Sequence, residues 1–135
     1  MDHRSNRVAD VTASVLYNLE YQHDWTLLNV DETTGWRALI RGLPPRRLYI
    51  HPDDQIAALE HEKATGEPVD NTPEYEWVLA VHPEEKWSIN GFAGIFDSID
   101  NSGPREKRLL LATVHNDSTV VYYLMHEGMV KPRQN

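Results

Sequence analysis

The stretch that most constrains the fold is a continuous apolar run, Leu109–Val114, which contains no charged or turn-forming residue. A run of this kind, without alternation, is typical of a strand that is buried on both faces in the middle of a sheet. A tight turn over residues 116–118 separates it from a second strand, predicted over residues 119–125. The sequence therefore predicts two adjacent strands that close the domain.

Helical spacing of apolar residues predicts three helices. The first spans residues 8–23, the second opens at Pro52 and continues to about Lys63, and the third is capped by Ser88. The first apolar stripe consists of Val8, Val11, Val15 and Leu19. The stripe of the third helix consists of Phe92, Ile95, Phe96 and Ile99.

Shorter strands complete the predicted fold. They are expected over residues 25–30, 36–40, 48–50 and 77–81. A chain of 135 residues is of the usual size for one domain. The predicted fold class is therefore α/β: a single small domain over residues 1–135, with frayed termini, a mixed and mainly antiparallel sheet, and about three helices.

Composition excludes several classes of function. The formal net charge is −8, which argues against a protein that binds nucleic acid unaided. There is no cysteine, so disulfides, thiolate nucleophiles and cysteine-based zinc sites are excluded. No signal peptide and no membrane-spanning apolar run is present, so a soluble, intracellular protein is expected. The seven histidines stand apart from one another, and neither a metal site nor a cofactor is predicted.

One literal match to an enzyme pattern remains as an alternative. Pro52-Asp53 followed by Glu84-x-Lys86 resembles the motif of metal-dependent nucleases. That chemistry requires the two carboxylates close together around Mg²⁺, with the lysine polarising the attacked phosphate. Here both segments also read as ordinary charges at helix ends, so the metal-dependent nuclease is the alternative and not the leading hypothesis.

The densest basic cluster lies between residues 41 and 47 and contains Arg41, Arg46 and Arg47. Guanidinium groups match phosphate oxygens in a bidentate manner, so these residues are candidates for RNA contact. Their alternative role is to pair with Asp53 and Asp54. A homodimeric RNA-binding module is a further possible function for a chain with such a cluster.

The last predicted strand is the candidate interface. Adjacent tyrosines place one ring on each face of a strand, so one can enter the core while the other meets solvent or a partner. An apolar strand at a sheet edge invites aggregation unless something covers it. The alternative is an interior strand covered by its own chain. The candidate interface residues are Asp117, Ser118, Thr119, Val120, Val121, Tyr122, Tyr123 and Leu124.

Three stretches together resemble a known family. They are LPPRRLYIHPD, EWVLAVHPEEKW and LLLATVHNDSTVVYYLMHEGMVKP. The chain resembles the small, non-catalytic structural subunit of the eukaryotic tRNA-splicing endonuclease, the Sen15 type. The similarity covers most of the chain and is strongest over residues 105–132.

This resemblance implies a nuclease-like α/β domain within a complex that removes introns from precursor tRNA. Catalytic relatives use a Tyr, His and Lys triad without a metal. Here Glu74-Tyr75-Glu76 stand where the histidine would be expected, and Lys107 lies near the position of the lysine. A lone lysine cannot act as both general base and general acid, so no catalytic residue is assigned.

The resemblance also implies the partners. They are catalytic and structural subunits of the endonuclease, reached by pairing of final strands, and precursor tRNA bound within the complex. An acidic turn before the last strand, here His115–Ser118, is implied to dock into a basic pocket of the assembly. A homodimer of the isolated chain is a further expectation. The expected location is the nucleus, with the cytoplasm or the periphery of an organelle as the alternative.

Overall fold

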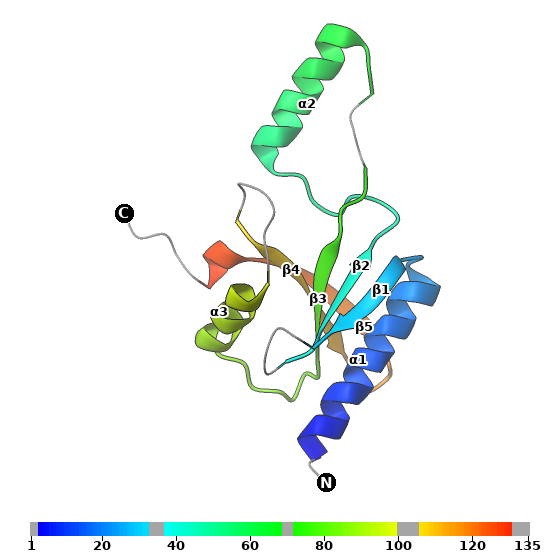
Figure 1. Ribbon diagram of the computed structural model, residues 1–135, viewed down its shortest axis with the longest axis vertical. Coiled ribbons are helices and arrows are strands. Elements are labelled where there is room, and N and C mark those ends of the chain that lie inside the picture. Colours follow the sequence, from blue (N-terminus) through cyan, green and yellow to red (C-terminus); the bar gives the residue numbers. More distant parts are fainter. Residues whose placement is uncertain (1–2, 33–36, 69–71, 100–105, 131–135) are drawn as a thin grey trace.

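The computed structural model describes residues 3–32, 37–68, 72–99 and 106–130 (Figure 1). Within these ranges the chain forms three α-helices and five strands. The helices are α1 (His3–Gln22), α2 (Pro52–Thr65) and α3 (Ile89–Ser98), and a 3-10 turn, η1, covers Glu127–Met129. The strands are β1 (Thr26–Asp31), β2 (Leu39–Leu43), β3 (Glu76–Val81), β4 (Arg108–Val114) and β5 (Val120–His126).

The five strands form one mixed sheet in the order β1-β2-β3-β4-β5. Neighbouring strands are antiparallel except for β3 and β4, which are parallel and are joined by a crossover through α3. Strand β4 lies between β3 and β5, as the apolar run predicted. The predicted fold class, a small α/β domain with a mixed and mostly antiparallel sheet, is confirmed.

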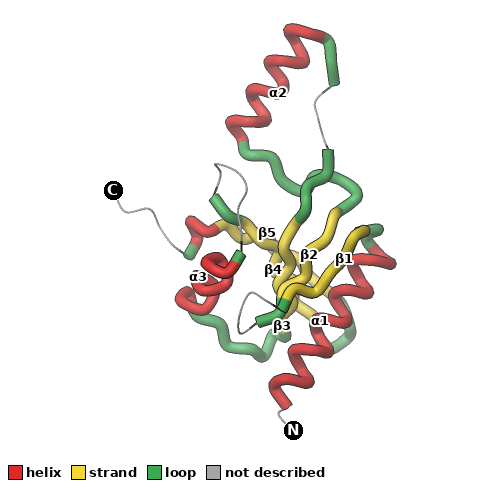
Figure 2. Tube along the Cα trace, viewed as in Figure 1, coloured by secondary structure: helices red, strands yellow, loops and turns green. Residues whose placement is uncertain are grey.

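Helix α1 covers one face of the sheet (Figure 2). Its apolar stripe packs with residues from three strands because alternate strand residues point to the same face. The buried cluster on this face contains Val11, Val15, Leu19, Trp25, Ile40, Val78, Ala80, Ala112 and Val114.

Helix α3 covers the opposite face, so the domain has three layers. Ser88 caps the helix: its hydroxyl accepts a hydrogen bond from the Gly91 backbone N–H at 3.0 Å, as the sequence predicted. The chain returns to this face after β5, because Val130 is buried there. This second cluster contains Leu39, Leu79, Val81, Ile95, Phe96, Ile99, Leu109 and Val130.

A partly buried ion pair joins the segment after β3 to the segment that leads into β2. The Arg37 guanidinium donates to the Glu85 carboxylate and to the carbonyl oxygen of Ala80. Glu85 also accepts a hydrogen bond from the His82 backbone N–H at 2.7 Å. Burial raises the pKa of Glu85, but the hydrogen bonds from Arg37 and His82 outweigh burial and leave that pKa lowered.

The predicted strand over residues 48–50 is wrong: this segment is irregular. Pro44 and Pro45 precede it and offer no backbone N–H for a ladder. Tyr49 instead packs at the end of the sheet, where its ring contacts the His126 ring with centroids 4.8 Å apart. Contacts between side chains therefore replace the expected strand pairing.

The other predicted elements within the described ranges are present, with ends shifted by a few residues. Helix α1 begins earlier than predicted, at His3, and β2 begins later, at Leu39. Residues 131–135, at the C-terminus that the sequence predicts to be frayed, lie outside the described residues.

Two isoleucines of α3 offer a matched test of this packing. Ile95 is 2% exposed, whereas Ile89, at the start of the same helix, is 65% exposed. Ile95→Ala should lower the free energy of unfolding by about 2–5 kcal/mol, because it removes buried methylenes and leaves a cavity. Ile89→Ala should change it by less than about 0.5 kcal/mol. Urea denaturation of both variants measures the difference, and equal losses would contradict the assigned core.

Candidate protein interface

Strand β5 forms one edge of the sheet. It pairs with β4 over its whole length, from Val120 opposite Val114 to His126 opposite Arg108, without a bulge. No described strand lies along its other side. In an antiparallel pair the backbone groups of alternate residues point away from the neighbouring strand. The outer side of β5 therefore presents a row of hydrogen-bonding groups.

The side chains of β5 face both layers. Tyr122 points to the α1 side, where its hydroxyl donates to the Asn18 Oδ1 at 2.6 Å and its ring meets His23 edge to face at 5.5 Å. Burial raises the pKa of Tyr122 to about 12. Tyr123 points the other way and is 56% exposed. One tyrosine is thus tied into the domain while its neighbour is available to a partner.

The two edges of the sheet differ in their protection. At the opposite edge, the pairing of β1 is irregular between Thr26 and Asn29, and Leu27 has a positive φ of 52°. Natural sheets use such bulges, together with charges and prolines, to discourage edge-to-edge pairing. Between Val120 and Met125, β5 has no bulge, charge or proline. Only β5 among the described strands is an edge without these devices.

A tight turn leads into β5. The His115 backbone N–H donates to the carbonyl oxygen of Thr119 at 2.9 Å, and Ser118 adopts a positive φ of 68°. Asp117 is exposed, and its Oδ1 accepts the Thr119 backbone N–H at 3.1 Å. Hydrogen bonds from the Thr119 hydroxyl and backbone lower the pKa of Asp117, so the turn carries a negative charge at neutral pH.

An apolar hollow of about 320 Å³ lies beside β5 on the α1 face. Sequence patterns gave no sign of it, because its walls come from helix, strands and loop at distant positions. It is lined by Leu19, His23, Trp25, Leu48, Leu110, Tyr122 and Leu124.

The three candidate RNA-contacting arginines lie in different environments. The Arg41 guanidinium lies over two aromatic rings, 5.2 Å from the centroid of Tyr75 and 5.0 Å from that of Trp77. Arg47 donates to the carbonyl oxygen of Thr72 at 3.0 Å and lies 3.5 Å from Glu74. Arg46 is exposed. The predicted alternative partners, Asp53 and Asp54, are not those that Arg47 contacts here.

A buried carboxylate lies near these arginines. Glu76 is 6% exposed and is held by Arg108, whose Nε is 3.0 Å from Oε1 and 3.1 Å from Oε2. Arg108 also bonds Glu74 at 3.0 Å and stacks over Tyr49 at 5.4 Å. Burial raises the pKa of Glu76, although Arg108 opposes this shift. Because Arg108 opens β4 opposite His126, this network fixes the ends of β4 and β5.

The residues at the positions that the resemblance implies for catalysis, 74–76 and 107, make contacts within the domain. Glu74 and Glu76 bind Arg108, and Tyr75 lies beside Arg41. Lys107 donates from Nζ to the carbonyl oxygen of Phe96 at 2.9 Å, near the C-terminal end of α3, where a cation is favourable.

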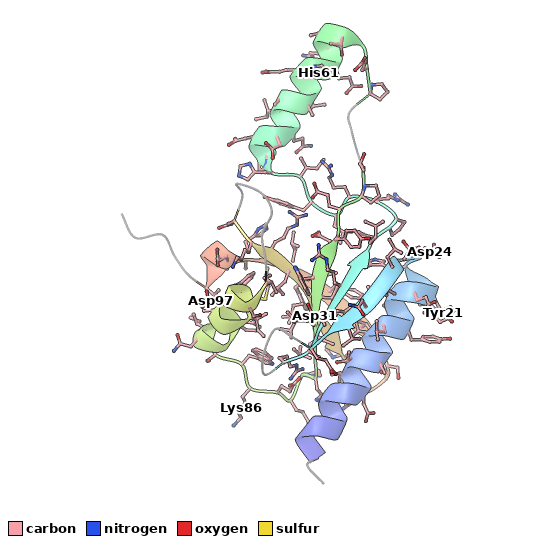
Figure 3. The ribbon with its side chains drawn as sticks, in the orientation of Figure 1. Tyr21, Asp24, Asp31, His61, Lys86 and Asp97 are labelled. Atoms are coloured by element: carbon pink, nitrogen blue, oxygen red, sulfur yellow. The ribbon has the colours of Figure 1, made fainter. Side chains whose placement is uncertain are left out.

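The residues of the nuclease alternative are not gathered into one site. Asp53 lies in the first turn of α2, the helix that projects at one end of the molecule, whereas Lys86 lies toward the opposite end (Figure 3). Glu84 belongs to the turn after β3. Across the described ranges, no group of three or more His, Asp or Glu side chains is placed to hold a metal ion. The same ranges contain no helix long and apolar enough to cross a membrane.

The fold and its surface define a small three-layer α/β domain with an unprotected edge strand. Comparison with known proteins identifies the family. A family model described as "Sen15 protein" matches residues 14–135. The chain belongs to the Sen15 family, which confirms the resemblance seen in the sequence.

Three curated relatives carry matching names. "Probable tRNA-splicing endonuclease subunit tsp-1" of Neurospora crassa is 47% identical, over 93% of this chain and 66% of its own length. "tRNA-splicing endonuclease subunit SEN15" of Eremothecium gossypii is 29% identical, over 93% of this chain and 91% of its own length. "Probable tRNA-splicing endonuclease subunit sen15" of Schizosaccharomyces pombe is 31% identical, over 65% of this chain and 71% of its own length. The chain thus spans just under two thirds of the Neurospora protein.

Removing the cation beside Glu76 should destabilise the domain. Arg108→Ala leaves a buried carboxylate without its partner, which costs about 3–5 kcal/mol for a fully buried pair and less here, because Arg108 is 19% exposed. The pKa of Glu76 is raised in the folded state, so the folded chain holds this proton more tightly than the unfolded chain does. The stability that the protonated carboxyl contributes is therefore fully present below the ordinary pKa of 4.5 and is lost as pH rises through the folded-state pKa.

The destabilisation caused by Arg108→Ala should therefore be larger at neutral pH than below pH 4.5. Adding Glu76→Gln should recover part of it at neutral pH. Thermal or urea unfolding at both pH values measures these differences. A destabilisation that is independent of pH, and that Glu76→Gln does not relieve, would contradict the assigned role of Arg108.

Proposed function

We propose that this chain is a non-catalytic subunit of the tRNA-splicing endonuclease, joined to a catalytic subunit by strand addition along β5. The observation that carries the proposal is the unprotected outer edge of β5 between Val120 and Met125, where the pairing with β4 is regular. Strand addition uses backbone hydrogen bonds for affinity and alternate side chains for specificity. Membership of the Sen15 family, and the names of its relatives, support the assembly to which the chain contributes.

A supporting role fits the contacts at the positions that correspond to catalytic groups in the resemblance. Lys107 is engaged with the end of α3, and Glu76 with Arg108. In the described part of the chain, neither is hydrogen-bonded to a histidine that could share proton transfer. We therefore assign this chain no step in cleavage and expect the partner subunits to carry the chemistry. The nuclear location stays a prediction.

The electrostatics agree with shared RNA binding. A chain of net charge −8 repels phosphate as a whole, while Arg41, Arg46 and Arg47 supply a local cationic surface. We propose that these residues contact precursor tRNA only within the assembled complex. Of the three, Arg46 is the best candidate for a phosphate contact, because Arg41 stacks on rings and Arg47 binds Glu74.

Val121→Asp should break the assembly. It places a carboxylate in the middle of β5, where strand addition would bury it without a partner at a cost of several kcal/mol. Co-purification with a tagged catalytic subunit measures the effect, and the expected result is that this chain no longer appears in the complex. Circular dichroism of the isolated variant checks that the domain still folds.

The opposite edge provides a matched control. Leu27 lies on β1, is 65% exposed and has a positive φ that aspartate tolerates. Leu27→Asp should leave the complex intact. If Val121→Asp co-purifies as well as Leu27→Asp does, strand addition along β5 is wrong. A β5-dependent dimer of this chain that excludes the catalytic subunit would instead favour the homodimeric module.

Arg46→Ala should weaken binding of precursor tRNA by the intact complex. Removing one side chain that binds a phosphate reduces the slope of log K against log salt by about one. The control is Lys86→Ala, because Lys86 is exposed at the far end of the molecule (Figure 3) and should leave tRNA affinity unchanged. Equal effects of the two variants would argue against a specific contact. If the isolated chain cleaved RNA in the presence of magnesium, and Lys86→Ala abolished that cleavage, the metal-dependent nuclease would be supported instead.

A further inference from the structure

Helix α2 stands apart from the rest of the domain. It projects from one end of the sheet, away from the layers that α1 and α3 form (Figures 1 and 2). None of its residues is buried. Two of its large apolar side chains are open to solvent, with Ile56 56% and Leu59 49% exposed. A shallow hollow on this side is lined by Ile56, Leu59, Glu60, Glu62 and Lys63.

Local interactions specify α2 in place of packing. At its start, the His51 Nδ1 accepts the Asp53 backbone N–H at 3.1 Å, and Pro52 occupies the first turn. Asp53 and Asp54 favour the positive end of the helix dipole. At its end, Gly66 adopts a left-handed conformation, and its N–H donates to the carbonyl oxygen of Glu62 at 2.7 Å.

A helix so specified still requires something to pack against. An isolated helix of 14 residues is only marginally stable in water, even with good caps, and helices in proteins are held mainly by burial of an apolar stripe. Ile56 and Leu59 are three residues apart and therefore lie on the same side of α2. The described part of this domain does not bury that side.

Ile56 and Leu59 form the exposed apolar stripe of α2, and the charges around it indicate what covers it. Helix α2 carries Asp53, Asp54, Glu60 and Glu62 against one lysine, Lys63. Two of the acids and the lysine border the same hollow as the exposed apolar side chains. A complementary surface has an apolar floor for Ile56 and Leu59 and a rim of Lys or Arg for the carboxylates.

We infer that α2 is a docking helix that binds an apolar groove rimmed by Lys or Arg on another protein subunit of the same assembly. Laying the apolar side of a helix into a groove is a common mode of protein recognition. This inference rests on the proposed function, since it takes the partner from the endonuclease complex. It adds a second contact, separate in the chain from β5.

Other occupants fit the charges less well. RNA phosphates would be repelled by the acidic residues of α2, as would the anionic surface of a membrane. Pairing of two α2 helices from two copies of this chain would bring like charges together around the stripe. A protein groove with an apolar floor and a basic rim would bury the apolar side chains and pair with the carboxylates.

Hydrogen exchange tests burial of α2. The complex is purified through a tag on a different subunit, and amide exchange is compared between the complex and the isolated chain. Amides in the middle of α2 should exchange about tenfold or more slowly in the complex. Exchange in β5 is read in the same experiment and reports the proposed strand addition independently.

Zero-length carbodiimide crosslinking tests the charge of the groove. The reagent joins carboxylates to amines in direct contact, so Glu60 and Glu62 should link to lysines of another subunit. Because a rim of arginines would not react, charge reversal complements it: Glu60→Lys with Glu62→Lys should abolish the protection of α2. The same pair of substitutions in the isolated chain should leave its fold unchanged, because both positions are exposed.

Matched apolar variants test the stripe itself. Ile56→Ser with Leu59→Ser should return α2 exchange in the complex to the rate of the isolated chain. Ile89→Ser, at an exposed isoleucine on α3, should leave α2 protection intact. If the double serine variant alters α2 in the isolated chain, the charge-reversal pair, which keeps the stripe, decides the question.

The outcomes separate the two proposals. If β5 is protected and α2 is not, the docking inference is wrong and the proposed function stands. If this chain is absent from the complex, the proposed function fails. Protection of α2 that appears only when tRNA is added would contradict the protein groove and indicate RNA as the occupant. Protection that rises with the concentration of the isolated chain would contradict it and indicate a second copy.

Discussion

The hydrogen-bonded ladder around β4 is the constraint on which the rest of the structure depends. This strand pairs in parallel with β3 and antiparallel with β5, and it supplies buried residues to both faces, Ala112 beneath α1 and Leu109 beneath α3. Its first residue, Arg108, neutralises the buried Glu76 of β3. Backbone pairing, two apolar layers and a buried ion pair thus meet on β4, and β5 lies beyond it as one edge of the sheet.

Sequence patterns were sufficient where a signal is local. Apolar periodicity located α1 and α3, turn residues located the β4–β5 hairpin, and an apolar run identified β4. The segment over residues 48–50 failed because its residues favour strands while the sheet offers it no pairing position, so side-chain contacts of Tyr49 decided its conformation. The pair of Glu76 with Arg108 spans 32 positions, and the hollow beside β5 draws on five separate segments. Neither leaves a periodic signal. The assignment of β5 as an interface remains a prediction.

The two edges of the sheet and the projecting helix are the features from which association of this domain is proposed. The pairing of β1 is irregular in register, whereas β5 pairs in regular register and is apolar from Val120 to Met125. Helix α2 is specified by its own caps and bears acids around an exposed apolar stripe. If the proposed contacts form, an acidic chain with these two exposed surfaces would gain stability from basic and apolar neighbours.

The chain on either side of β5 is anchored. The turn before it is closed by the bond between His115 and Thr119, and beyond it the Glu127 N–H donates to the carbonyl oxygen of Lys107 at 2.8 Å before Val130 enters the core. A strand fastened at both ends is ordered before any partner binds. If a partner adds to β5 as proposed, little conformational entropy would be lost in ordering the strand, so encounter and desolvation would govern the rate and affinity of binding.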